Sequence, residues 1–88
     1  MTNSPVVLGL DFGGTKIAAA VCDLAGNELG STVVESRAGN GARASFDHGV
    51  ETARGLLASA TPGATLAAVG VSTFGIPFAV YGGLRRSP

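Results

Sequence analysis

The first third of the chain alternates between apolar segments and turn residues in a way that predicts three β-strands. Residues 6–11 (VVLGLD) are short, apolar and rich in β-branched side chains, which is typical of a buried strand. Residues 16–22 are again apolar, whereas residues 28–35 are more polar and are expected nearer an edge of the sheet. The turns at 12–15 and 23–27 are short, so the three strands are predicted to form an antiparallel meander.

The hydrophobic period changes after a loop at residues 36–42, and the new period predicts a helix over residues 43–60. The Thr-Pro-Gly sequence at 61–63 is expected to end this helix. Charged residues are expected on its polar side: Asp47, Glu51 and Arg54. Apolar residues at helical spacing are expected on its buried side: Phe46, Val50, Ala53, Leu57 and Ala60.

A fourth strand is predicted over residues 66–72 (LAAVGVS). Because a helix joins it to the meander, this strand is expected to lie parallel to one of the first three. The predicted fold class is therefore α/β, with the element order β-β-β-α-β and a mixed sheet. Residues 79–88 predict no regular element.

Charge and cysteine content restrict the classes of function. Six Lys and Arg residues balance six Asp and Glu residues, so neither nucleic acid nor an anionic membrane is an expected partner. One cysteine and one histidine cannot build a zinc site or a disulfide framework. The low cysteine content and the lack of a basic, apolar leader predict a cytoplasmic protein.

A membrane-spanning alternative arises because no charged residue occurs from 55 to 84, and two arginines follow. In this reading residues 64–84 form a small protein's C-terminal apolar span. The segment contains four glycines, one proline and several hydroxyl side chains, which make a poor lipid-facing helix. A strand followed by a glycine-containing loop explains these residues better.

The sequence LGLDFGGTK contains the most specific chemistry in the chain. Gly13 and Gly14 are expected to adopt backbone conformations that other residues resist, and to let N–H groups approach phosphate oxygens without an intervening Cβ. Thr15 can donate its hydroxyl to phosphate, and Lys16 can supply a positive charge. Asp11 ends an apolar strand, where a carboxylate is costly unless paired or bound to metal, and its oxygens suit Mg²⁺.

Two common phosphate-binding motifs do not fit this segment. Gly9 and Gly14 have the spacing of a Walker A loop, but the Thr-Lys order is reversed and a strand is expected to follow instead of a helix. The dinucleotide pattern G-x-G-x-x-G is also absent. A phosphate would therefore be held by a β-hairpin. The alternative is a Gly-Gly turn that joins two strands and binds nothing.

The stretch LGLDFGGTKIAAAVCDLAGN resembles the first phosphate-binding motif of the ROK family, which contains bacterial sugar kinases and repressors. The later stretch LAAVGVSTFGIP resembles the strand and loop where the family reads G-[IV]-[SG]-x-x-G-P-[IV]. Together the two stretches extend the resemblance over about residues 6–78, and their separation also matches the family.

The resemblance implies the start of a ribonuclease-H-like lobe of the actin and hexokinase type, in which two lobes close over ATP and a sugar. It implies that Asp11 lies at the Mg²⁺ ion and that the loop 72–77 forms part of the sugar site, with Gly75 closest to the sugar. Phe74 and Ile76 depart from the family pattern in that loop. The residues implied to cradle the ATP phosphates are Gly13, Gly14, Thr15 and Lys16.

The implied reaction is phosphoryl transfer from ATP to a sugar hydroxyl by a glucokinase-like enzyme, which as a full-length protein could form a homodimer. In the family the catalytic base is the aspartate of an Asn-Asp pair, and this chain contains no such pair. Residues 1–78 are thus expected to be an N-terminal fragment of the lobe that is inactive alone, and residues 79–88 a truncated or frame-shifted tail. The alternative within the family is a fragment of a repressor's sugar-sensing domain, although only five residues precede Val6 and leave no room for a DNA-binding module.

Overall fold

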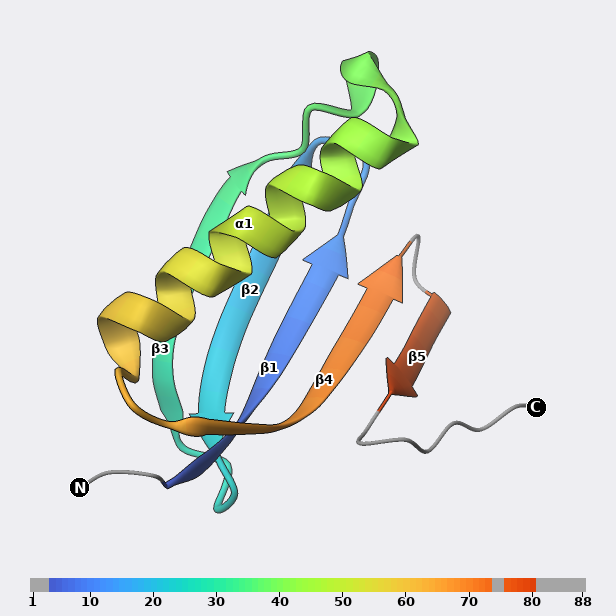
Figure 1. Ribbon diagram of the computed structural model, residues 1–88. Helices are drawn as coiled ribbons and strands as arrows, with labels where there is room; N and C mark the ends of the chain where they lie inside the picture. The colour runs from blue at the N-terminus through green and yellow to red at the C-terminus, as the bar shows by residue number, and fades with distance from the viewer. Residues whose placement is uncertain (1–3, 74–75, 81–88) are drawn as a thin grey trace.

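The computed structural model describes residues 4–73 and 76–80, which form one sheet and a helix that covers part of it (Figure 1). A single turn of 3₁₀ helix, η1, precedes the α-helix. The elements in chain order are β1 (Pro5–Phe12), β2 (Lys16–Asp23), β3 (Glu28–Glu35), η1 (Ala38–Asn40), α1 (Ala42–Ala60), β4 (Thr65–Thr73) and β5 (Ile76–Val80).

The sheet has the strand order β3-β2-β1-β4-β5. β1, β2 and β3 form the predicted antiparallel meander. The helix returns the chain to the other side of β1, where β4 pairs with β1 in parallel. The predicted β-β-β-α-β order, the mixed sheet and the parallel placement of the fourth strand are therefore confirmed.

Helix α1 packs diagonally across β1, β2 and β3 on one face of the sheet (Figure 1). Every second residue of β1 and β2 is buried beneath the helix because side chains alternate between the two faces of a strand. The buried core consists of Val6, Leu8, Leu10, Ile17, Ala19, Val21, Ala53 and Leu56.

The buried side of α1 agrees with the prediction in part, since Ala53 is buried and Leu57 and Ala60 pack against the core. Gly49, Ala53 and Leu56 are the buried helix residues, whereas Phe46 is 50% exposed. The Phe46 ring stacks on Phe12 with 6.0 Å between ring centroids, so only one of its sides is covered. The hydrophobic pattern could not predict that Gly49 is buried, because glycine has no apolar side chain to contribute to the pattern.

The C-terminal part of the described chain was predicted incorrectly. Residues 72–77 were expected to be a loop, but β4 extends to Thr73 and β5 begins at Ile76. β5 pairs with β4 in an antiparallel hairpin, which covers the backbone edge that β4 would otherwise expose. Residues 74–75 and 81–88 lie outside the described residues, so Phe74, Gly75 and most of the predicted tail are not placed.

The membrane-spanning alternative required a helix over residues 64–84. In the structure residues 65–73 and 76–80 are strands. No helix within the described ranges is long and apolar enough to cross a membrane.

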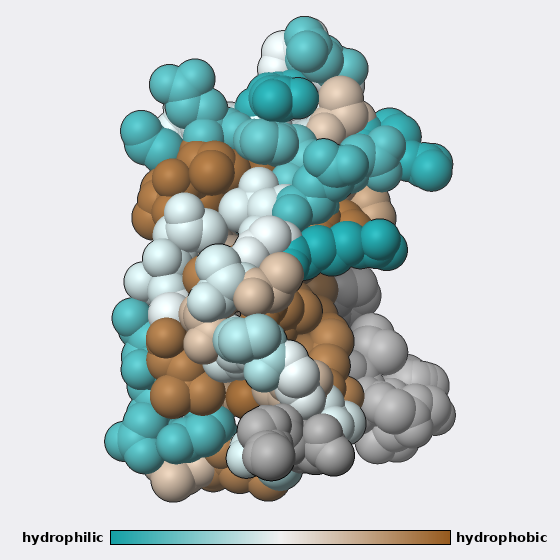
Figure 2. Space-filling model, turned by 60° about the vertical axis from the view of Figure 1, so that its left-hand side comes forward, coloured by the Kyte–Doolittle hydropathy of each residue, from teal (hydrophilic) through white to brown (hydrophobic). Residues whose placement is uncertain are grey.

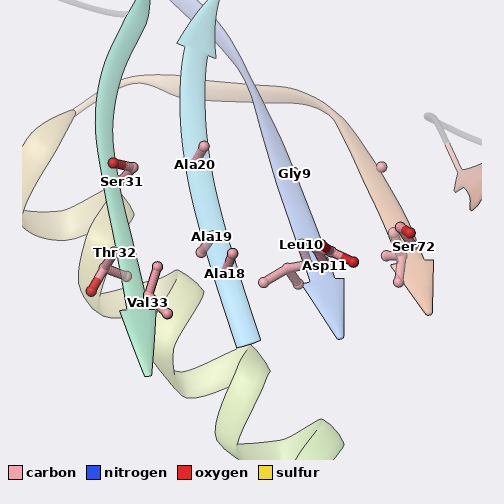
Figure 3. A pocket seen from close by; sticks show the side chains of 12 residues that line it. Gly9, Leu10, Asp11, Ala18, Ala19, Ala20, Ser31, Thr32, Val33 and Ser72 are labelled. Carbon is pink, nitrogen blue, oxygen red and sulfur yellow. The ribbon is translucent and has the colours of Figure 1, made fainter. Parts of the chain in front are cut away.

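The sheet face opposite α1 is not covered by any described element. Its central positions carry very small side chains, among them Gly9, Ala18, Ala20 and Gly70, which line a shallow cavity of about 720 Å³ (Figure 3). Figure 2, turned so that the β3 side comes forward, shows apolar patches among polar surface on that side of the molecule. We call the uncovered side the open face.

Candidate functional site

The predicted phosphate-binding segment is the tight hairpin between β1 and β2. Phe12 and Ile17 are the last residues paired in the ladder, and the Gly13 N–H donates a hydrogen bond to the Lys16 carbonyl oxygen at 2.8 Å. Gly14 and Thr15 form the exposed tip of the turn. The segment is therefore a β-hairpin, as the sequence predicted, and lies in no helix.

The two glycines do not adopt the backbone conformations that the sequence suggested. Neither Gly13 nor Gly14 has a positive φ, so the expectation of unusual backbone shapes is wrong. At Gly13 the reason for glycine is space, because a Cβ there would lie 3.2 Å from the Lys16 carbonyl oxygen. A Cβ on Gly14 would meet nothing within 4 Å, so no contact within the described residues requires glycine at that position.

The backbone N–H groups of the hairpin are not equally available. The Gly13 N–H is already bonded to Lys16, whereas the N–H groups of Gly14 and Thr15 have no hydrogen-bond partner among the described residues. Adjacent N–H donors in a turn suit an anionic oxygen. Gly13 therefore contributes close packing of the turn, and Gly14 and Thr15 contribute donors.

Asp11 and Lys16 lie on the same face of the sheet, beside this turn. Asp11 pairs with Ala18 of β2, and Lys16 precedes Ala18 by two residues, so the side chains of all three project to the open face. Asp11 and Lys16 are both exposed. The hairpin thus presents a carboxylate and an ammonium group on either side of the free N–H groups.

The site lies at the carboxyl ends of two parallel strands. β1 ends at Phe12 and β4 ends at Thr73, and the register places Asp11 beside Ser72 (Figure 3). In open α/β sheets ligands bind outside the carboxyl ends of the strands. The structure therefore brings Ser72, the first residue of the predicted sugar-site loop, next to the predicted metal ligand, while Gly75 is outside the described residues.

Two residues at the end of β3 contribute to this site and were missed from the sequence. Glu35 is the cross-strand partner of Lys16. Ser36 follows it, is 3% exposed, and donates its hydroxyl to the Gly14 carbonyl oxygen at 3.1 Å. The register of β3 against β2 brings both residues to the hairpin, and only a count of residues outward from the 23–27 turn could have found them.

Two other carboxylates, Asp23 and Asp47, form hydrogen bonds or ion pairs away from the hairpin. Asp23 lies at the far end of β2 and accepts hydrogen bonds from the N–H groups of Ala25 and Asn27. The Asn27 side-chain amide also bonds to it, and these hydrogen bonds lower the pKa of Asp23. Asp47 forms an exposed ion pair with Arg43, one helical turn away. Neither carboxylate lies at the hairpin.

The cavity on the open face is distinct from the hairpin. Its lining is almost entirely apolar and small, and only Asp11 and Ser72 connect it to the candidate site. An apolar hollow suits an apolar side chain better than a charged phosphate, because burying a charge without partners is costly. A phosphate-binding site is therefore expected at the hairpin, on the rim of the cavity, and not inside the cavity.

Comparison of the chain with protein-family models, with curated proteins and with solved structures found no significant match.

Proposed function

We propose that the β1–β2 hairpin binds the phosphates of Mg-ATP and that the chain is the N-terminal part of a ROK-type sugar kinase. The observation that supports this most strongly is the pair of N–H groups at Gly14 and Thr15. They have no hydrogen-bond partner within residues 4–73 and 76–80 and lie in an exposed turn beside Asp11 and Lys16. Asp11 and Lys16 add a carboxylate and an ammonium group on the same face of the sheet.

The charges around the hairpin favour a metal-bound phosphate over a bare one. Asp11 and Glu35 are two carboxylates near a single ammonium group, that of Lys16. Bare triphosphate would meet like charge, whereas Mg²⁺ bridges phosphate oxygens and carboxylates. Asp11 would hold the ion directly or through its bound water. The described residues form no cluster of three or more His, Cys, Asp or Glu side chains that could hold a metal, so the phosphate and water would supply the other ligands.

In phosphoryl transfer the protein contributes mainly positioning and charge stabilisation. The Gly14 and Thr15 N–H groups would orient phosphate oxygens, and the Lys16 ammonium group would offset their charge. Ser72 and Thr73 end β4 at the same edge of the sheet as the hairpin, and the register sets Ser72 beside Asp11. This proximity supports a sugar site next to the nucleotide. These residues bind and orient. A base for the sugar hydroxyl has to come from outside residues 1–78.

The proposal can be tested by calorimetry of the purified chain with Mg-ATP. Replacement of Lys16 by Ala should weaken binding by about tenfold or more, because a charge-assisted contact to phosphate is lost. Asp11→Asn should weaken binding only when Mg²⁺ is present, and EDTA should reduce wild-type binding. Arg54→Ala is the matched control, since Arg54 is an exposed cation on α1.

Two outcomes would refute the proposal. One is an absence of Mg-ATP binding to the folded wild-type chain. The other is binding that Lys16→Ala and Arg54→Ala weaken equally, because the nucleotide would then respond to net charge and not to the hairpin.

A further inference from the structure

Ser36 holds the hairpin tip from the end of the neighbouring strand. Its hydroxyl donates to the Gly14 carbonyl oxygen at 3.1 Å, and its N–H donates to the Thr15 carbonyl oxygen at 2.9 Å. Two consecutive carbonyl groups of the turn are therefore bonded to one residue. Ser36 is 3% exposed, and it is the one polar residue that is buried among the described residues.

These hydrogen bonds fix the direction of the N–H group at the tip. The described peptide bonds are all trans, and in a planar trans peptide the C=O and N–H groups point in opposite directions. The Gly14 carbonyl and the Thr15 N–H belong to the same peptide unit. Because Ser36 draws the Gly14 carbonyl toward itself, the Thr15 N–H faces away from Ser36 and out of the turn.

The backbone directly after Ser36 adopts a strained conformation. Arg37 has a φ of 59°, and it is the one described residue other than glycine with a positive φ. That conformation is unfavourable for a residue with a Cβ. It turns the chain away from β3 directly after Ser36. Strain of this kind persists where surrounding contacts hold it and is concentrated at functional sites.

We propose that Ser36 is a positioning residue for phosphate binding, which sets the orientation of the Gly14–Thr15 peptide before the ligand arrives. This inference rests on the proposed phosphate site in the hairpin. It assigns a role to a residue that does not itself touch the nucleotide. Without the Ser36 hydroxyl, the peptide is free to rotate, and phosphate binding must then supply the cost of ordering it.

The test compares three substitutions in the whole chain. Ser36→Ala removes the hydroxyl, Ser36→Cys keeps a side chain of similar size with a weak donor, and Ser36→Thr keeps the hydroxyl. Binding of Mg-pyrophosphate and of Mg-ATP is measured by calorimetry, at a temperature where each variant is shown by circular dichroism to be folded. Amide order parameters of Gly14 and Thr15 are measured without ligand.

Ser36→Ala and Ser36→Cys are expected to bind both ligands about tenfold more weakly than wild type and to lower the two order parameters. Ser36→Thr is expected to restore both. If Ser36→Ala does not fold, the comparison of Cys with Thr gives the same answer. Equal affinity and equal order in all variants would overturn the proposal while leaving the phosphate site intact. If wild type binds neither ligand, the phosphate site itself fails, and this inference fails with it.

Discussion

At the scale of residues, neighbouring positions of the hairpin make different contributions to the proposed phosphate site. Gly13 closes the turn, Gly14 and Thr15 offer N–H groups, and Lys16 supplies a cation. The sequence predicted these positions because glycines next to Thr-Lys have chemistry that does not depend on the rest of the fold. The roles of Glu35 and Ser36 could not be predicted in the same way, because they depend on the register of β3 against β2.

The turn at the opposite end of β2 provides a pH-dependent test of local structure. Hydrogen bonds from the Asn27 side chain and backbone lower the pKa of Asp23 in the folded state. Its contribution to stability is then complete above the pKa of the unfolded chain and is lost as the pH falls through the lower folded pKa. An NMR titration of the Asp23 carboxyl carbon should give a midpoint below the ordinary aspartate value.

Asn27→Ala should move that midpoint upward, toward the ordinary value, since the largest contributor to the shift is the Asn27 side chain. An Asp23 midpoint that is ordinary in wild type, or that does not change in Asn27→Ala, would show that the turn is not closed by this carboxylate.

At the scale of elements, the sequence predicted the type and order of the first four strands and of α1, because hydrophobic period and turn residues are local signals. The rotation of α1 about its axis was predicted less well. The helix turns Gly49 and Leu56 to the sheet, since glycine lets it approach Phe12 closely: a Cβ on Gly49 would lie 2.6 Å from that ring. β5 was missed because its partner, the edge of β4, becomes visible only in the assembled sheet.

The close approach of α1 to β3 predicts opposite effects for two glycine-to-alanine substitutions. A Cβ on Gly30 would lie 2.6 Å from the Ala60 Cβ and 3.3 Å from a Leu56 methyl group, so Gly30→Ala forces the helix outward. We expect it to lower the free energy of unfolding by about 1–2 kcal/mol. Urea unfolding followed by circular dichroism measures this change.

Gly55→Ala is the matched comparison, because Gly55 is an exposed helix position with open space where the Cβ would go. Alanine has the higher helix propensity, so the free energy of unfolding should rise by about 0.5–1 kcal/mol. If Gly30→Ala were as stabilising as Gly55→Ala, the packing of α1 on β3 described above would be incorrect.

At the scale of the whole molecule, one face of the sheet is packed and the other is open. α1 covers β1 to β3, whereas the opposite face presents small apolar side chains around a shallow cavity with the hairpin at its rim. This arrangement suits a lobe that completes its site with further structure. Catalysis of sugar phosphorylation, a cytoplasmic location and a homodimer of the full-length protein remain predictions, and the 88-residue chain is expected to transfer no phosphoryl group alone.

The most direct test of the central claim is a heteronuclear NMR titration of the whole chain with Mg-ATP. The account predicts saturable shifts of amide signals confined to residues 11–16 and their contacts at Glu35 and Ser36, with the largest changes at Gly14 and Thr15. Shifts centred instead on the small-residue positions of the open face, or no shifts in a chain shown to be folded, would contradict the binding of phosphate by this hairpin.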